Sequence, residues 1–258
     1  MRYVIANDSE EERTRLRLLA ELTDPYTCYQ LEAIGVEPGW RCLEIGAGLG
    51  TVSTWLADKV GGEGEVVCTD LQTKFLQDVD HPRIRVERLD ILQEPQRHGA
   101  FDLAVARNVH HHIPDRLAAM RNLVEMVKPG GHILYVEPDL HPAMADFHPV
   151  WQRAFEAFRQ WGEQHDIDLF TGRRLPHQLA AAGLDIVSSR GETALFSGKG
   201  VGPAAELYRR TFALIMDDLV AMGFLSQADG DEVDRLLDSE QAWLMNFCFF
   251  AVHARKSG

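Results

Sequence analysis

The sequence has few of the features that mark metal-binding, redox, secreted or membrane proteins. Its only cysteines are Cys28, Cys42, Cys68 and Cys248, and they form no Cys-x-x-Cys pair, so neither a zinc site nor a redox dithiol is indicated. No apolar run approaches the roughly 20 residues that span a bilayer. The N-terminus becomes acidic too early for a secretion signal. We therefore expect a cytoplasmic protein with no membrane partner and no metal bound by cysteine.

Clustered basic charge is also missing. Lys and Arg number 26 against 39 Asp and Glu, which gives a formal net charge of -13, and the basic residues are scattered along the chain. Nucleic-acid affinity depends on basic surface that neutralises phosphates. The composition therefore predicts a small-molecule partner and no nucleic acid. The hydrophobic share of 45% and the length of 258 residues suit one α/β domain with an elaboration.

Strand and helix patterns alternate along most of the chain. A helix is predicted over 9–35, and apolar runs predict strands at 41–45, 65–70, 84–90, 101–107, 131–137, 185–190 and 243–255. Helices are predicted between them at 51–60, 73–78, 114–127 and 174–182, with two more in 203–241. This alternation predicts a Rossmann-like, doubly wound, mostly parallel seven-stranded sheet with an antiparallel last strand.

A glycine-rich turn joins the first strand to the next helix. Residues 44–50 are Glu-Ile-Gly-Ala-Gly-Leu-Gly, and such a turn lets a ligand approach bare backbone at a helix N-terminus. A dinucleotide fingerprint needs its third glycine where Thr51 stands, which disfavours a nicotinamide cofactor. The spacing Glu-x-Gly-x-Gly-x-Gly resembles motif I of class I S-adenosylmethionine (SAM)-dependent methyltransferases. A tight turn without a ligand is the alternative.

Polar residues follow the next strands at the positions that a SAM site needs. Asp70 ends the second strand and can accept hydrogen bonds from both ribose hydroxyls, or else cap the following helix. Leu71 can pack on the adenine. Asp90 can accept from the adenine amino group and Ile91 can offer its backbone amide, although Asp90 also suits a solvated turn. These residues are therefore candidate cofactor ligands.

The resemblance extends in order along roughly residues 40–140. Arg107 and Asn108 end the fourth strand, where the methionine part of SAM is expected, although both can simply cap the loop. The segment Val-Lys-Pro-Gly-Gly-His-Ile-Leu at 127–134 resembles the segment that usually leads into the fifth strand of these methyltransferases. The resemblance implies that the backbone at Gly46, Gly48 and Gly50 lies near the methionine and ribose. It also implies that Glu44 holds the ammonium group, directly or through water.

Three consecutive histidines supply the candidate general base. Residues 108–115, Asn-Val-His-His-His-Ile-Pro-Asp, resemble the His-His-x-Pro-Asp segment of small-molecule methyltransferases, including sugar O-methyltransferases. His111 and His112 match its histidines, and histidine suits proton removal near neutral pH. The alternative is that one or both cap the next helix or pack beneath SAM. Neighbours in one extended run point to different sides, so we expect no metal here.

Carboxylates after the fifth strand are further candidates. Glu137 and Asp139 can orient a histidine, act as base, or merely cap a loop. His141 and His148 lie in the next segment, which is rich in histidine and aromatic residues. Arg173 and Arg174 can clamp an acidic substrate group or can be solvated charges at a helix start.

Together these patterns predict one class I methyltransferase domain over 1–258. Its parts are N-terminal helices at 1–39, a SAM-binding core at 40–140, and helical lid insertions at 141–172 and 195–240 that cover the carboxyl edge of the sheet. The predicted activity is methyl transfer to O, N or C of a small aromatic or apolar secondary metabolite. A cyclase or decarboxylase that uses SAM, or a non-catalytic SAM-binding module, is the alternative. A homodimer is left open.

Overall fold

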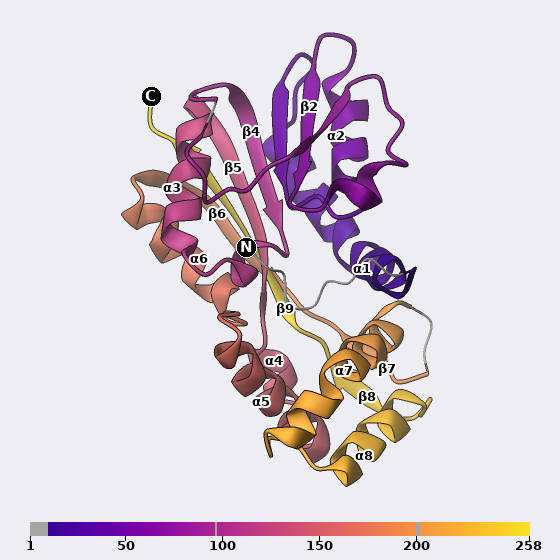
Figure 1. Ribbon diagram of the computed structural model, residues 1–258. Helices are drawn as coiled ribbons and strands as arrows, with labels where there is room; N and C mark the ends of the chain where they lie inside the picture. Colours follow the sequence, from indigo (N-terminus) through magenta and orange to yellow (C-terminus); the bar gives the residue numbers. More distant parts are fainter. Residues whose placement is uncertain (1–9, 96, 200–201) are drawn as a thin grey trace.

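The computed structural model describes residues 10–95, 97–199 and 202–258. Its centre is a seven-stranded sheet in the spatial order β3-β2-β1-β4-β5-β9-β6 (Figure 1). The strands are β1 (Arg41–Ile45), β2 (Glu65–Asp70), β3 (Ile84–Arg88), β4 (Phe101–Arg107), β5 (Val127–Asp139), β6 (Leu184–Glu192) and β9 (Cys248–Lys256). β9 runs antiparallel to β5 and β6. The other neighbouring strands, from β3 to β5 in this order, pair in parallel. The predicted mostly parallel sheet with an antiparallel last strand is confirmed.

Helices cover both faces of this sheet. Side chains alternate along a strand, so Leu103 and Val105 of β4 pack on one face, whereas Ala104 and Ala106 pack on the other. The first face is covered by α1 (Glu10–Ile34) and α2 (Thr51–Val60), and the second by α3 (Arg116–Met126) and α6 (Thr171–Ala181). Two apolar layers therefore hold the sheet and fix the positions of its carboxyl ends.

A second helical body lies at one end of the sheet, at the bottom of Figure 1. We call it the cap; it contains α4 (His141–Met144), α5 (Pro149–Gln164), α7 (Ala204–Ala221), α8 (Gln227–Leu237) and a small sheet of β7 (Leu195–Ser197) and β8 (Trp243–Met245). Trp151 is fully buried at its centre and meets Phe155 and Tyr208 edge-on, with ring centroids 4.8 and 5.4 Å away. Edge-to-face aromatic packing thus gives the cap a core of its own.

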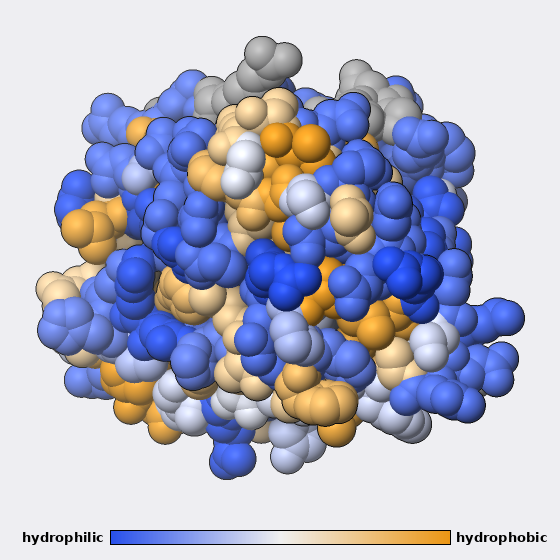
Figure 2. Space-filling model, turned by 90° about the horizontal axis from the view of Figure 1, so that it is seen from below, coloured by the Kyte–Doolittle hydropathy of each residue, from blue (hydrophilic) through white to orange (hydrophobic). Residues whose placement is uncertain are grey.

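The surface seen from the cap end mixes hydrophilic residues with small separated apolar patches (Figure 2). Across the described part of the chain, we find no helix that combines the length and the apolar content needed to cross a membrane.

The predicted single strand over 243–255 is wrong, because the chain leaves the strand conformation at Asn246 and Phe247. β8 pairs with β7 in the cap, and β9 begins only at Cys248. The buried hydroxyl of Tyr208 donates to Asn246 Oδ1, which also accepts from the amide of Phe247 at 2.8 Å. The same Phe247 amide lies 3.3 Å from the Tyr208 hydroxyl oxygen. This polar network turns the chain from the cap into the central sheet.

We expect Tyr208→Phe to destabilise the fold by about 1–3 kcal/mol, because it leaves buried partners without the hydroxyl that they contact. The measurement is urea unfolding followed by circular dichroism. Tyr29→Phe is the matched control, since the Tyr29 side chain is 60% exposed. Equal unfolding midpoints for the two variants would show that the hydroxyl network does not stabilise the junction.

Candidate active site

A cavity of about 670 Å³ opens at the carboxyl ends of β1, β2 and β4. This is the edge at which open α/β sheets bind ligands. Leu16 and Leu19 of α1 form part of its wall. The cavity brings together most of the predicted cofactor ligands, namely Gly46, Gly48, Asp70, Leu71, Asp90, Ile91, Arg107 and Asn108. Glu44 and Gly50 do not line it, so their predicted contact with the cofactor stays a prediction.

The glycine turn after β1 needs its glycines for two different reasons. Gly46, Gly48 and Gly50 have φ values of 64°, 58° and 72°, in the left-handed region that side chains disfavour. A Cβ at Gly46 would lie 2.2 Å from Val109 Cγ2, and one at Gly50 would lie 2.7 Å from Val79 Cγ2. At Gly48 the nearest atom is Leu16 Cδ2 at 3.8 Å. Gly48 therefore presents open backbone to the cavity, whereas Gly46 and Gly50 allow the turn to pack.

Asp70 joins this turn to the next loop. One carboxylate oxygen accepts from the amide of Gly48 and the other from the amide of Gln72, both at 3.0 Å. Each oxygen keeps a second lone pair for a ligand hydroxyl. The N-cap residue of the short 3-10 helix η1 (Thr73–Leu76) is Gln72, so Asp70 is not the helix cap considered in the alternative. Burial raises the pKa of Asp70, and the amides of Gln72 and Gly48 oppose that shift.

Asp90 has a comparable local role at the end of β3. Its Oδ1 accepts from the amide of Leu92 at 3.0 Å, which forms a tight turn. The carbonyl of Ile91 accepts from the side chain of Asn122 at 2.7 Å, so that segment is held against α3. Both predicted adenine contacts therefore lie on fixed backbone at the cavity wall.

Arg107 is buried at the other end of the cavity and ties α1 to the sheet. Its Nη1 donates to Thr23 Oγ1 at 2.7 Å and lies 3.2 Å from Asp24 Oδ1. Within the described ranges its Nε has no hydrogen-bond partner. A buried guanidinium with an unsatisfied N–H suits the carboxylate of an amino-acid ligand.

Glu44 lies behind the glycine turn. It is fully buried and accepts a hydrogen bond of 2.5 Å from Ser53 Oγ. Burial raises the pKa of Glu44 to about 7, and the nearby charge of Arg107 opposes that shift. The carboxyl group therefore changes charge close to neutral pH.

A smaller cavity of about 70 Å³ adjoins the first one. The two share Leu19, Asn108 and His112 in their walls. The rest of the smaller cavity is mostly apolar, and its walls come largely from the cap and the junction to β9: Phe158, Leu169, Leu207, Tyr208, Phe247 and Phe249. His111 also lines it. The predicted base thus lies beside the larger cavity, in the wall of a small and mostly apolar one.

Glu137 holds His111 in place. It is fully buried and accepts from the amides of Val109 and His110 at 2.9 and 2.8 Å, and it bonds His111 Nδ1 at 2.6 Å. Burial raises the pKa of Glu137, but the charge and hydrogen bond of His111, the charge of His110 and the amide of Val109 outweigh burial and lower it overall. An ionised Glu137 only accepts, so His111 Nδ1 donates the hydrogen of this bond. In the neutral form of His111, Nε2 is then the nitrogen without a proton. Glu137 lines neither cavity and is thus placed to orient the histidine.

The three histidines of the 3-10 turn η2 (His110–His112) occupy different surroundings. His112 lines both cavities, and its ring centroid lies 3.8 Å from that of His111. Burial lowers the pKa of His112 well below its ordinary value, so His112 is neutral. His110 lines neither cavity and packs edge-on against Tyr135, and burial lowers its pKa to about 4. Among the residues that the structure describes, no three side chains are grouped to hold a metal ion.

Several other candidate residues have partners within the protein. The buried carboxylate of Asp139 accepts two hydrogen bonds from Arg173, and Arg174 bonds Asp168. His148 Nδ1 bonds Asp146 at 3.0 Å, and neither His148 nor His141 lines a cavity. These pairings give Arg173 and Arg174 protein partners, and their contact with an acidic substrate group stays a prediction.

Sequence reasoning missed the contribution of α1. Glu12 lines the larger cavity and its bonded neighbour Arg15 lines the smaller one. No motif marks these positions, and the helical spacing of apolar residues predicted only a packed helix. Leu169, from the loop between α5 and α6, was missed for the same reason.

We expect Glu44→Gln to change how stability depends on pH. The folded pKa of Glu44 is raised above its ordinary value of 4.5, so its ionisation destabilises the fold as pH rises from about 4.5 to 7. A shift of this size corresponds to roughly 3 kcal/mol. Relative to the natural protein, the variant should therefore gain stability between pH 5 and 8, as measured by urea unfolding. A difference that does not change with pH would contradict the buried, titrating Glu44.

Known proteins that are similar to this chain indicate its family. The family model described as "Methyltransferase domain" matches residues 10–189. The highly reducing polyketide synthase PKS2 of Leptosphaeria maculans is 29% identical over 171 residues, which is 59% of this chain and 7% of that protein. The ubiquinone/menaquinone biosynthesis C-methyltransferase UbiE of Idiomarina loihiensis is 28% identical over 117 residues, 42% of this chain and 47% of that one. The chain thus spans less than half the length of these relatives.

Solved structures show the same fold. A SAM-dependent methyltransferase from Aquifex aeolicus superposes with a TM-score of 0.55 at 14% identity, covering 96% of this chain and 99% of that one. The cyclase SpnF superposes with a TM-score of 0.51 at 16% identity, covering 86% of this chain and 76% of that one. The matched region of the family model includes the glycine turn, Asp70, the histidine turn and Glu137, and the predicted SAM cofactor agrees with it. The chain belongs to the methyltransferase domain family.

Proposed function

We propose that this protein is a SAM-dependent methyltransferase that methylates a proton-bearing O, N or C atom of a small apolar or aromatic metabolite. The observation that carries the proposal is the His111–Glu137 pair in a pocket that adjoins the cofactor cavity. A positioned histidine base is useful only if the acceptor must lose a proton, so the pair favours such an acceptor.

The residues of the larger cavity suit SAM. Asp70 would accept from the ribose hydroxyls, and Asp90 with the Ile91 amide would meet the adenine. Arg107 and Asn108 would lie at the methionine end, with the open backbone of Gly48 nearby. When bound, SAM supplies a methyl group on a sulfonium that is displaced in line by the acceptor.

The chain's own contribution is alignment, proton removal and exclusion of water. His111 Nε2 would take the proton of the acceptor while Glu137 stabilises the resulting imidazolium, a step worth about 10²–10⁴-fold in rate. His112 stays neutral at the boundary of the two cavities, so it adds no second positive charge there. The apolar walls from the cap keep water from the reacting atoms.

The acceptor class is proposed from the pocket and from the relatives. The pocket is lined mainly by aromatic and aliphatic side chains. The relatives are named as polyketide synthases and a quinone-biosynthesis C-methyltransferase, which supports a natural-product acceptor and makes a carbon acceptor reasonable. SpnF is named as a cyclase on this fold, so fold alone does not decide the reaction. The His111–Glu137 pair favours methyl transfer over a cyclase reaction.

The direct test incubates the protein with methyl-labelled SAM and a panel of phenols, amines and 1,3-dicarbonyl compounds. We expect label in at least one product and an equal amount of S-adenosylhomocysteine. Conversion of an acceptor with no label incorporated and no S-adenosylhomocysteine formed would overturn methyl transfer and favour a cyclase or decarboxylase.

Asp70→Asn should weaken SAM binding roughly 10- to 100-fold, because it removes charge-assisted hydrogen bonds worth about 1.5–3 kcal/mol each. Isothermal calorimetry with SAM and S-adenosylhomocysteine measures this change. Asp78→Asn is the control, since Asp78 is exposed and pairs with Arg13. An Asp70 variant that binds SAM as tightly as the control would remove Asp70 from the site.

His111→Ala should lower kcat by about 10²–10⁴-fold while SAM affinity stays within twofold of the natural protein. His98→Ala is the control, because His98 is exposed and contacts only the surface carboxylate of Glu125 among the ion pairs described. Turnover and calorimetry together separate the two effects. Unchanged turnover in the His111 variant would mean that the acceptor needs no base from this residue.

A further inference from the structure

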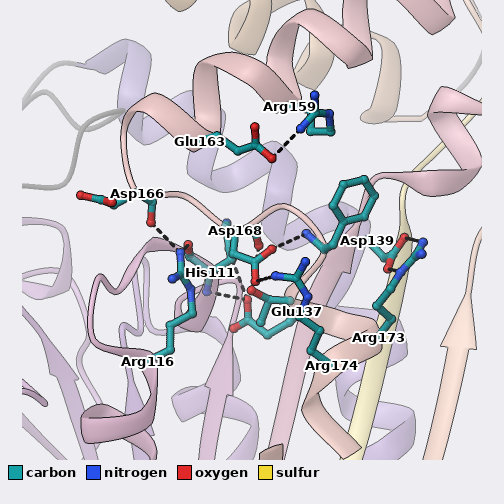
Figure 3. Close-up of polar contacts among 12 residues, drawn as sticks. His111, Arg116, Glu137, Asp139, Arg159, Glu163, Asp166, Asp168, Arg173 and Arg174 are labelled. Atoms are coloured by element: carbon teal, nitrogen blue, oxygen red, sulfur yellow. Dashed lines mark hydrogen bonds and ion pairs between the residues drawn. The ribbon is translucent and has the colours of Figure 1, made fainter. Parts of the chain in front are cut away.

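The turn that carries His111 is held from two sides (Figure 3). On the inner side, Glu137 bonds the ring and the backbone amides of the turn. On the other side, the carbonyl oxygen of His111 accepts from the amide of Asp168 at 2.9 Å and from Arg116 Nη2 at 3.1 Å. The His111 amide also donates to Glu137 Oε2 at 3.3 Å, so the backbone of the proposed base is bonded at both its N–H and its C=O.

Arg116 also reaches the loop that follows the cap helix α5. The same Nη2 donates to the carbonyl oxygen of Asp166 at 2.5 Å. Asp166 has a φ of 59°, which is uncommon for a residue other than glycine and costs free energy. One guanidinium nitrogen thus bridges the carbonyl of His111 and a loop residue in a strained conformation.

The loop that Arg116 contacts forms part of the acceptor pocket. Residues 165–170 join α5 to α6, and Leu169 from this loop lines the smaller cavity together with His111. The Leu140 amide donates to the Leu169 carbonyl at 3.1 Å, which fixes the loop at the end of β5. A shift of the loop would move a wall of the pocket and the hydrogen-bond partners of His111 together.

We infer that Arg116 is a positioning residue that aligns His111 with the acceptor pocket by bonding both the His111 carbonyl and the 165–170 loop. Arg116 lines neither cavity, so it acts through His111. The inference rests on the proposed function, because it assigns a role in orienting the proposed base. Arg174 provides a matched comparison: it bonds the side chain of Asp168 in the same loop but makes no described hydrogen bond to His111.

The first experiment needs no acceptor. Protein labelled with ¹⁵N-histidine is examined by proton NMR for the His111 Nδ1–H resonance, assigned by its loss in His111→Ala. We expect a slowly exchanging resonance in the natural protein and in Arg174→Ala. In Arg116→Ala its exchange with solvent should be at least about tenfold faster, because the hydrogen bond to Glu137 opens more often. Arg116→Lys should lie between the two, since one ammonium group can donate to both carbonyl oxygens but lies on a shorter, more flexible side chain.

The second experiment uses any acceptor that the natural protein methylates. Arg116→Ala should lower kcat by on the order of 10- to 100-fold, as expected for a misaligned base, while SAM affinity measured by calorimetry stays within twofold. Arg116→Lys should recover part of the loss, and Arg174→Ala should retain full turnover.

The two experiments distinguish a failure of the inference about Arg116 from a failure of the proposed function. Identical Nδ1–H exchange in Arg116→Ala and Arg174→Ala overturns the inference, and so does a kcat effect that is equal in the two variants. If Arg116→Ala does not fold, the same comparison is made between Arg116→Lys and Arg174→Ala. A natural protein that converts an acceptor without incorporating label, but whose Nδ1–H exchange responds only to Arg116, would contradict the proposed function while supporting Arg116 as the residue that holds His111.

Discussion

The site depends above all on one buried carboxylate. Glu137 lies at the carboxyl end of β5 and gathers the amides of the turn that follows β4, together with the ring of His111. A buried negative charge is costly unless it is fully bonded. These donors satisfy Glu137, and in doing so they join two neighbouring strands and fix the ring of His111 with its Nδ1 toward the carboxylate. Most other features of the site either support this pair or enclose it.

Enclosure comes from parts of the chain outside the sheet. α1 supplies Leu19, which lies in the wall of both cavities, and Arg107 anchors that helix through Thr23 and Asp24. The cap supplies the aromatic wall of the smaller cavity and bonds the carbonyl of His111 through its 165–170 loop. His111 is therefore supported by the sheet on one side and by the 165–170 loop on the other, so His111 and the smaller cavity keep one relative geometry.

Local patterns were sufficient for most of the fold. The strand limits 41–45, 65–70 and 101–107 agree with β1, β2 and β4, because apolar runs between turn residues are set within a few positions. The break at Asn246 was missed, because its cause is a hydrogen bond to Tyr208, which lies 38 residues earlier. The partners of Arg173 and Arg174 could not be predicted from the sequence either, because an arginine at a helix start can contact solvent, substrate or a carboxylate of the protein. Eight of the ten predicted cofactor ligands line one cavity, since successive strand ends share an edge.

The sequence by itself determined the sheet, the cofactor edge and the resemblance to SAM-dependent methyltransferases, because glycine spacing and strand-end carboxylates are local features whose geometry follows from the strands. The tertiary structure decided the surroundings of each histidine, and on those surroundings His111 is the proposed base. His110, His111 and His112 are adjacent and chemically identical in the sequence. Only folding buries His110 against Tyr135, keeps His112 neutral between the cavities and brings Glu137, 26 residues away, against the ring of His111. Burial and a distant hydrogen-bond partner set these differences, and neither is encoded in the spacing of the residues.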